Sequence, residues 1–138
     1  ASAIGLVQLR KLDENNKKRE KVAEEYIKKL KSISEIHLPF RDYKGKPSYH
    51  IFPILLSERI SREKFMSGLR EKGIQTSIHY PPIHLFTYYR KIFRFKEDML
   101  PKTEYVGKHE VTLPLHPLMD HEDVEYVVKS IEEFLEHS

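Results

Sequence analysis

The sequence predicts a small α+β domain, in which an antiparallel sheet has helices packed on one face. Long segments at both ends of the chain repeat apolar residues at three- and four-residue steps, as amphipathic helices do. Between them lie short aromatic or β-branched runs bounded by glycine and proline, which are typical of strands. With 138 residues, the chain is long enough for one domain with its own core.

The first segment, residues 1–33, is predicted to be one long helix. From residue 12 onward its apolar positions form a single stripe between charged residues. Its opening, "ASAIGLVQL", is apolar or small nearly all the way round, and such a helix is ordinarily buried on all sides. We therefore expect another domain or subunit to cover this turn, with the helix linking it to a small domain over residues 34–138.

The sheet is predicted from four short segments. "EIHLPF" (35–40) and "YHIFPILL" (49–56) are rich in apolar residues, and Pro53 in the second is expected at an edge or a bulge. "IQTSIHY" (74–80) alternates in the manner of a strand, and "EVTLPL" (110–115) is a further short strand.

The remaining helices are predicted from their end signals. Ser61 and Gly73 mark the start and the stop of one helix. "TYYRKIFRF" (87–95) is expected to form a short aromatic helix, and Pro101 suits the first turn of the next. Asp120 is placed to cap the last helix, whose apolar side faces the core.

Composition excludes several classes of function. The chain has no cysteine, so it forms no disulfide or thiolate metal site, and a reducing, cytoplasmic setting is favoured. Lys and Arg number 24 against 21 Asp and Glu, and the two signs are interleaved, so nucleic acid is not expected as a partner. No apolar run approaches the length of a membrane span, so a membrane is not expected either. The histidines are scattered, whereas zinc needs three or four converging ligands, so no metal site is predicted. No GxSxG elbow and no glycine-rich phosphate loop is present.

One stretch, "SIHYPPIHLFTYYR" (77–90), concentrates aromatic rings and imidazoles around a Pro-Pro pair. The prolines fix the backbone outside the helical region and make a rigid corner. His79, Tyr80 and His84 can line a polar ligand pocket, and histidine can also shuttle a proton near neutral pH. The alternative is an aromatic-proline corner that only packs on the core. The residues alone leave both readings open.

Three segments in series carry a resemblance to a known family. They are "AIGLVQLRKLDENNKKREKVAEEY", "GIQTSIHYPPIHLFTYYR" and "VTLPLHPLMDHEDVEYVVKSI". In order and spacing they resemble the DegT/StrS family of sugar aminotransferases, over nearly the whole chain. The resemblance implies the C-terminal small domain of a type I fold aminotransferase that depends on pyridoxal phosphate (PLP).

The resemblance also implies a reaction. Members of this family act as dimers and typically move an amino group from glutamate onto a nucleotide-linked keto-sugar, in polysaccharide or secondary-metabolite sugar biosynthesis. The Schiff-base lysine and most cofactor contacts would belong to an N-terminal domain, so no catalytic or cofactor-binding residue is expected in this chain, and the isolated chain should be inactive. His79, Tyr80 and His84 are the expected substrate-binding residues.

Two other functions stay open. The chain could be a stand-alone interaction or regulatory module that dimerises without catalysis, since exposed apolar patches mark interfaces. The face it would use consists of Ala3, Ile4, Leu6, Val7 and Leu9. A small zinc- or sugar-phosphate-binding protein that uses the histidines is the third hypothesis.

Overall fold

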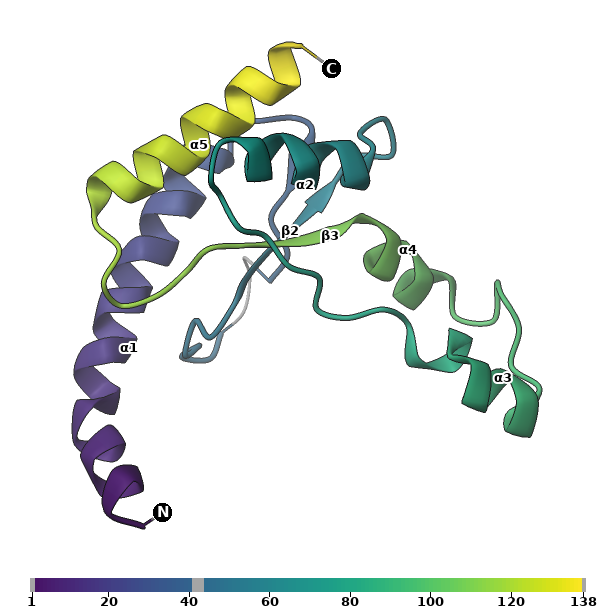
Figure 1. The fold of residues 1–138 in the computed structure, drawn as a ribbon, viewed down its shortest axis with the longest axis horizontal. Helices are drawn as coiled ribbons and strands as arrows, with labels where there is room; N and C mark the ends of the chain where they lie inside the picture. Colours follow the sequence, from purple (N-terminus) through teal and green to yellow (C-terminus); the bar gives the residue numbers. More distant parts are fainter. Residues whose placement is uncertain (1, 41–43, 138) are drawn as a thin grey trace.

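The structure is a computed structural model, and it describes residues 2–40 and 44–137. Three strands form an antiparallel sheet in the order β1-β2-β3, with helices against it (Figure 1). The elements are α1 (Ser2–Leu30), β1 (Ile36–His37), β2 (Phe52–Leu56), α2 (Arg62–Glu71), the 3-10 turn η1 (Ile83–Leu85), α3 (Thr87–Phe93), α4 (Pro101–His109), β3 (Glu110–Leu113) and α5 (His121–Glu136). The predicted α+β class is confirmed.

One face of the sheet is apolar and forms the core with α1, α2 and α5. Its cross-strand pairs include Phe52 with Leu113 and Ile54 with Val111, all of them buried. The Tyr26 ring of α1 lies 4.9 Å from the Phe52 ring, centroid to centroid. Fully burying side chains of this size contributes about 1.5–3 kcal/mol each. This packing fixes β3, which carries the polar residues of the opposite face.

Pro53 was expected at an edge or a bulge but lies in the middle strand, opposite Thr112. Thr112 exchanges both of its main-chain hydrogen bonds with Ser77 on its other side, so the pair needs no N–H from Pro53. β1 pairs only with Leu55 and Leu56, so the proline nitrogen has no opposing β1 residue either. The missing donor therefore interrupts neither ladder.

The helix expected over residues 1–33 ends at Leu30. The Ile33 N–H donates to the Leu30 carbonyl at 3.1 Å in a tighter turn. The Ser32 hydroxyl donates to the Lys29 carbonyl at 3.3 Å. Such side-chain bonds to the backbone compete with continued helix, which accounts for the earlier end.

The predicted ends of α2 are confirmed: Ser61 caps its start and Gly73 terminates it with a φ of 76°. The Gly73 N–H donates to the Arg70 carbonyl, and the Ile74 N–H donates to the Leu69 carbonyl, both at 2.9 Å. This paired pattern is a Schellman motif, and glycine adopts the required left-handed conformation without strain. It turns the chain sharply back toward β3.

The strand predicted over residues 74–80 is wrong, because only Ser77 pairs with β3, in an isolated bridge to Thr112. Two residues later the His79 N–H donates to the Glu110 side chain, Oε2, at 2.8 Å. Because a carboxylate takes the donor that a strand would give to a main-chain carbonyl, the ladder stops after one pair. The segment is fixed in place without becoming a fourth strand.

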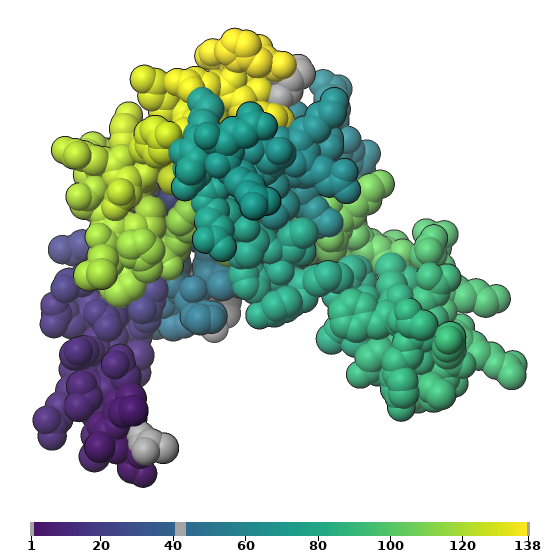
Figure 2. All heavy atoms as spheres, in the orientation of Figure 1, coloured from purple at the N-terminus to yellow at the C-terminus, as the bar shows by residue number. Residues whose placement is uncertain are grey.

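The start of α1 and the segment that contains α3 and α4 project from the rest of the molecule (Figure 2). Large apolar side chains are exposed on both. They are Ile4, Leu6, Val7, Leu9 and Leu12 on α1, and Phe86, Tyr88, Ile92, Phe93, Met99 and Leu100 on or beside α3. Contiguous exposed apolar residues of this kind mark interaction surfaces.

Candidate functional site

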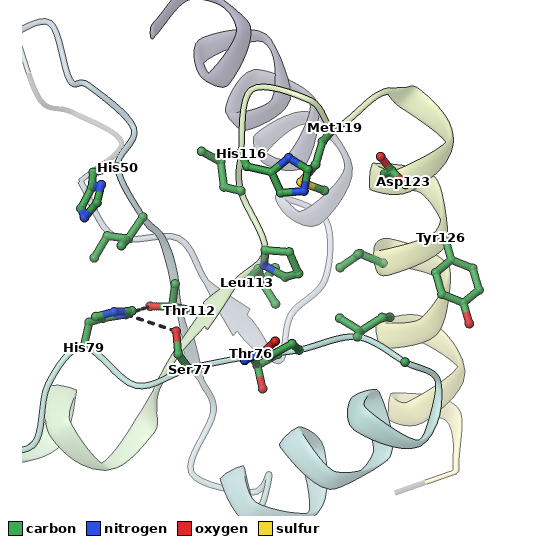
Figure 3. Close-up of a pocket in the computed structure, with 17 residues that line it drawn as sticks. His50, Thr76, Ser77, His79, Thr112, Leu113, His116, Met119, Asp123 and Tyr126 are labelled. Carbon is green, nitrogen blue, oxygen red and sulfur yellow. Dashed lines mark hydrogen bonds between the residues drawn. The ribbon is translucent and has the colours of Figure 1, made fainter. Parts of the chain in front are cut away.

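A pocket of about 540 Å³ opens between the segment after α2, the end of β3 and the start of α5 (Figure 3). One side of it is lined by Ser77, His79 and Thr112. The opposite side is lined by His116, Met119, Asp123 and Tyr126. Hydroxyl, imidazole and carboxylate groups thus converge beside apolar walls, the mixture that binds a polar small molecule.

His79 is held by hydrogen bonds on both its main chain and its ring. Its N–H donates to Glu110 Oε2, and its ring Nδ1 lies 2.8 Å from Thr112 Oγ1 and 3.4 Å from Ser77 Oγ. Glu110 is only 2% exposed, whereas His79 itself is partly exposed and lines the pocket. A buried framework therefore orients an imidazole that a ligand can reach.

Tyr80 follows directly and is 74% exposed. Its ring stands edge-on to the His79 ring, with centroids 4.8 Å apart and planes at 84°. The Tyr80 hydroxyl makes no hydrogen bond to any residue within 2–40 and 44–137. An exposed ring with a free hydroxyl, next to a residue that lines a pocket, can both stack on a ligand and bond to it.

His84 differs from His79, because it is 7% exposed and does not line the pocket. Its Nε2 lies 2.9 Å from Glu104 Oε1. Glu104 also accepts hydrogen bonds from the N–H groups of Asp98, at 2.9 Å, and Leu100, at 3.1 Å. The Asp98 N–H first, and then the His84 ring, hold the pKa of Glu104 below its ordinary value. His84 thus ties η1 to the first turn of α4 and, through Glu104, to the loop before it.

The proline corner packs directly on α4. A Cβ added at Gly107 would lie 2.5 Å from Cδ and Cγ of Pro82, so only glycine allows this approach. Arg62, the first residue of α2, donates to the Gly107 carbonyl and, at 3.4 Å, to the Glu110 carbonyl. These contacts join α2, α4 and the corner into one support for His79.

The opposite side of the pocket is anchored by α1. The Tyr26 hydroxyl donates to the Pro114 carbonyl at 3.1 Å, and burial raises the pKa of this tyrosine. Pro114 directly follows β3 and leads to His116, whose Nδ1 accepts the Leu118 N–H at 3.3 Å. The buried face of α1 therefore positions the loop that carries His116.

The sequence analysis predicted His79, which lines the pocket, as a site residue. It did not identify the other lining residues His50, His116, Asp123 and Tyr126. The one available signal was the position of His116 directly after a predicted strand and between two prolines, in "LPLHP". Asp123 and Tyr126 lie in the first turns of α5, where nothing in the local pattern separates a pocket residue from a solvated one.

Among residues 2–40 and 44–137, no three histidine, aspartate or glutamate side chains are grouped as metal ligands would be. In the same part of the chain, no helix has the length and apolar character needed to cross a bilayer.

Comparison with known proteins gives a consistent result. The profile of the DegT/DnrJ/EryC1/StrS aminotransferase family matches residues 1–132. An uncharacterised protein of Methanocaldococcus jannaschii, MJ1066, is 32% identical over 137 residues. The spore coat polysaccharide biosynthesis protein SpsC of Bacillus subtilis is 30% identical over 138 residues. Each match covers 97% of this chain but only 36% of the relative, so the chain spans little more than a third of their length.

Solved structures agree. Helicobacter pylori PseC, an aminotransferase of pseudoaminic acid biosynthesis, superposes with a TM-score of 0.89 at 27% identity, over 99% of this chain and 37% of PseC. S. venezuelae DesV superposes with a TM-score of 0.88 at 29% identity, over 97% of this chain and 35% of DesV. Streptococcus pneumoniae Spr1654, solved in PLP and PMP forms, gives 0.85 for its PLP form at 27% identity, over 96% of this chain and 34% of that protein.

Proposed function

This chain belongs to the DegT/DnrJ/EryC1/StrS aminotransferase family, and from this premise we propose that it is the C-terminal domain of a PLP-dependent sugar aminotransferase. The substrate is a nucleotide-linked keto-sugar, glutamate is the amino donor, and the product enters polysaccharide or secondary-metabolite biosynthesis. The name of SpsC, a spore coat polysaccharide biosynthesis protein, supports a product that enters polysaccharide biosynthesis. A cysteine-free chain suits a cytoplasmic setting.

The proposal assigns residues 1–33 to a linking helix and 34–138 to the small domain, with an N-terminal domain covering the first turns of α1. The exposure of Ile4, at 69%, and of Leu6, at 59%, supports a covering partner. The isolated chain is then inactive, and the intact protein is a homodimer.

The pocket residues of this chain do not hold PLP by themselves. Among the described residues, its lining contains neither a lysine to bond the cofactor aldehyde nor an arginine to hold the phosphate. What this chain contributes to the reaction is substrate position.

His79 and Tyr80 are the proposed substrate contacts. The observation that carries this role is a partly exposed imidazole oriented by buried Glu110, beside an exposed tyrosine ring and over a pocket. His84 was predicted as a third contact. Its burial and its bond to Glu104 support a part in holding the corner rather than in touching the sugar.

The test uses the intact polypeptide that contains this chain. His79→Ala and Tyr80→Ala should raise KM for the keto-sugar while leaving PLP absorbance unchanged. The matched control is His37→Ala, because His37 is exposed in β1 and outside the pocket. An intact protein that binds no PLP and aminates no sugar contradicts the proposed function, and unchanged KM in both variants contradicts the assigned contacts.

A second candidate function is a stand-alone module that dimerises through the first turns of α1, where Leu9 is 65% exposed. Sedimentation of the 138-residue chain should then show a tight dimer. Replacing Leu6 and Leu9 with serine should give monomers, since the substitutions remove apolar area from the interface. If the oligomeric state does not change, this candidate is excluded.

A further inference from the structure

A hydrogen-bonded chain runs from the buried carboxylate of Glu110 to the ring of His79 through the Thr112 hydroxyl. Thr112 Oγ1 donates to Glu110 Oε1, and His79 Nδ1 lies 2.8 Å from the same Oγ1. Glu110 is 2% and Thr112 6% exposed, so water has little access to either group. The number of hydrogens on each group determines which group donates and which accepts in this series of hydrogen bonds.

A threonine hydroxyl has one hydrogen to donate. Since that hydrogen goes to Glu110, Thr112 Oγ1 can only accept from His79. The proton in the 2.8 Å contact must therefore be on His79 Nδ1. A neutral imidazole carries one proton, so Nε2 then has a lone pair and no hydrogen.

We propose that Glu110 and Thr112 are positioning residues that fix His79 as the Nδ1–H tautomer, so that Nε2 accepts a hydrogen bond from a hydroxyl of the ligand. Nε2 has no partner among the described residues, and His79 lines the pocket. The ligand class, a sugar hydroxyl, rests on the proposed function. The inferred tautomer of His79 depends only on the contacts of Glu110 and Thr112 within this polypeptide.

The second oxygen of Glu110 makes the arrangement directional. Oε2 accepts the His79 main-chain N–H at 2.8 Å, which leaves Oε1 for the Thr112 hydroxyl. In Glu110→Gln, the amide oxygen must take the place of Oε2, because the N–H opposite it is a donor. The amide NH₂ then faces Thr112 and donates to it. The Thr112 hydroxyl is freed to donate to Nδ1, and His79 should change to the Nε2–H tautomer.

The measurement is a long-range ¹H–¹⁵N correlation spectrum of the imidazoles of the ¹⁵N-labelled 138-residue chain at pH 8, where imidazole is ordinarily neutral. The two tautomers differ in which ring nitrogen has the shift of a protonated nitrogen. Wild type should show Nδ1–H for His79. Glu110→Gln and Thr112→Val should both change it to Nε2–H, the first by reversing the donors and the second by removing the acceptor.

Two variants serve as matched controls. Thr112→Ser keeps the hydroxyl and should keep the Nδ1–H form. Ser77→Ala removes only the longer contact, at 3.4 Å, and should also keep it. Backbone amide spectra with wild-type dispersion confirm that each variant is folded.

An Nε2–H tautomer in wild type overturns the proposal. So does an Nδ1–H tautomer that persists in both folded variants, and a change in only one of them overturns the role of the other residue. Because the readout needs no cofactor, ligand or activity, its failure leaves the proposed aminotransferase function standing. Conversely, an intact protein that aminates no sugar leaves the tautomer result untouched.

Discussion

Replacing Gly107 with alanine tests how α4 supports the corner that carries the candidate substrate residues. The new Cβ would lie 2.5 Å from two ring atoms of Pro82 and 3.5 Å from its nitrogen. Ordinary contacts begin near 3.4 Å, so the proline ring or α4 has to move by roughly 1 Å. A proline ring has no rotamer that would let it swing away.

The steric cost of the added methyl group is partly offset by the higher helix propensity of alanine. Overpacking a well-packed contact costs about 1–3 kcal/mol. Alanine stabilises a helix interior by about 1 kcal/mol relative to glycine. The expected net result for Gly107→Ala is therefore a loss of about 1 kcal/mol of unfolding free energy, with displacement of the corner. Urea denaturation measures the loss of unfolding free energy, as a lower midpoint at unchanged m-value. Shifts of the His79 and Tyr80 amide resonances report the displacement of the corner.

The matched control is Gly5→Ala in α1, where nothing lies within 4 Å of the added Cβ. That variant should be no less stable than wild type and should leave the His79 resonance in place. A Gly107→Ala chain that is as stable as wild type, or more so, with an unmoved His79 amide would refute the reasoning.

Three further changes probe the supports of the fold. The pKa of Glu104 is held below its ordinary value of 4.5. The ionised carboxylate therefore contributes its full stabilisation above pH 4.5, and this stabilisation is lost as the pH falls through the lowered pKa. Glu104→Gln should remove this acid dependence of the unfolding midpoint. Tyr26→Phe removes the hydrogen bond to the Pro114 carbonyl and should cost about 1 kcal/mol in urea denaturation, and no loss would show that the bond is energetically neutral. Asp120→Ala removes a capping box and should lower the free energy of unfolding by about 1 kcal/mol, whereas Asp120→Asn, which keeps a capping oxygen, should cost less.

The helices could be predicted because their signals are local. Asp120 caps α5 through its neighbour Asp123, and Gly73 ends α2 through residues within the same turn, so a few adjacent letters contain the information. The small antiparallel sheet followed from apolar runs with turn residues between them. The helix ends depend on contacts within one segment of sequence, whereas the pairing of the strands joins distant segments.

The wrong strand over residues 74–80 arose because a distant side chain takes part. Residues 74–80 alternate as a strand should, but Glu110, 31 residues beyond His79, takes the N–H that would continue the ladder. The local sequence around His84 gave no sign of its partner Glu104, which lies 20 residues later and is bonded to the His84 ring. No local pattern specifies such pairings, because they exist only after the chain has folded.

In the candidate site, too, some residues could be predicted from the local sequence and others could not. His79 and Tyr80 could be singled out from their place at a rigid corner. Their neighbours His116 and Tyr126 come from the loop after β3 and from α5, and the core packing of α1 against α5 brings them to the pocket. Sequence reasoning identifies one side of such a pocket, and the fold supplies the other.

The central claim is that this chain acts as the C-terminal part of a longer PLP-dependent aminotransferase. The most direct test is to isolate, from the source cells, the polypeptide that antibodies against this chain detect, and to measure its mass and its visible absorbance. We expect a mass well above 16.5 kDa and the absorbance of bound PLP. A polypeptide of 16.5 kDa without bound cofactor would contradict the claim, and the exposed apolar turns of α1 would then point to the interaction module.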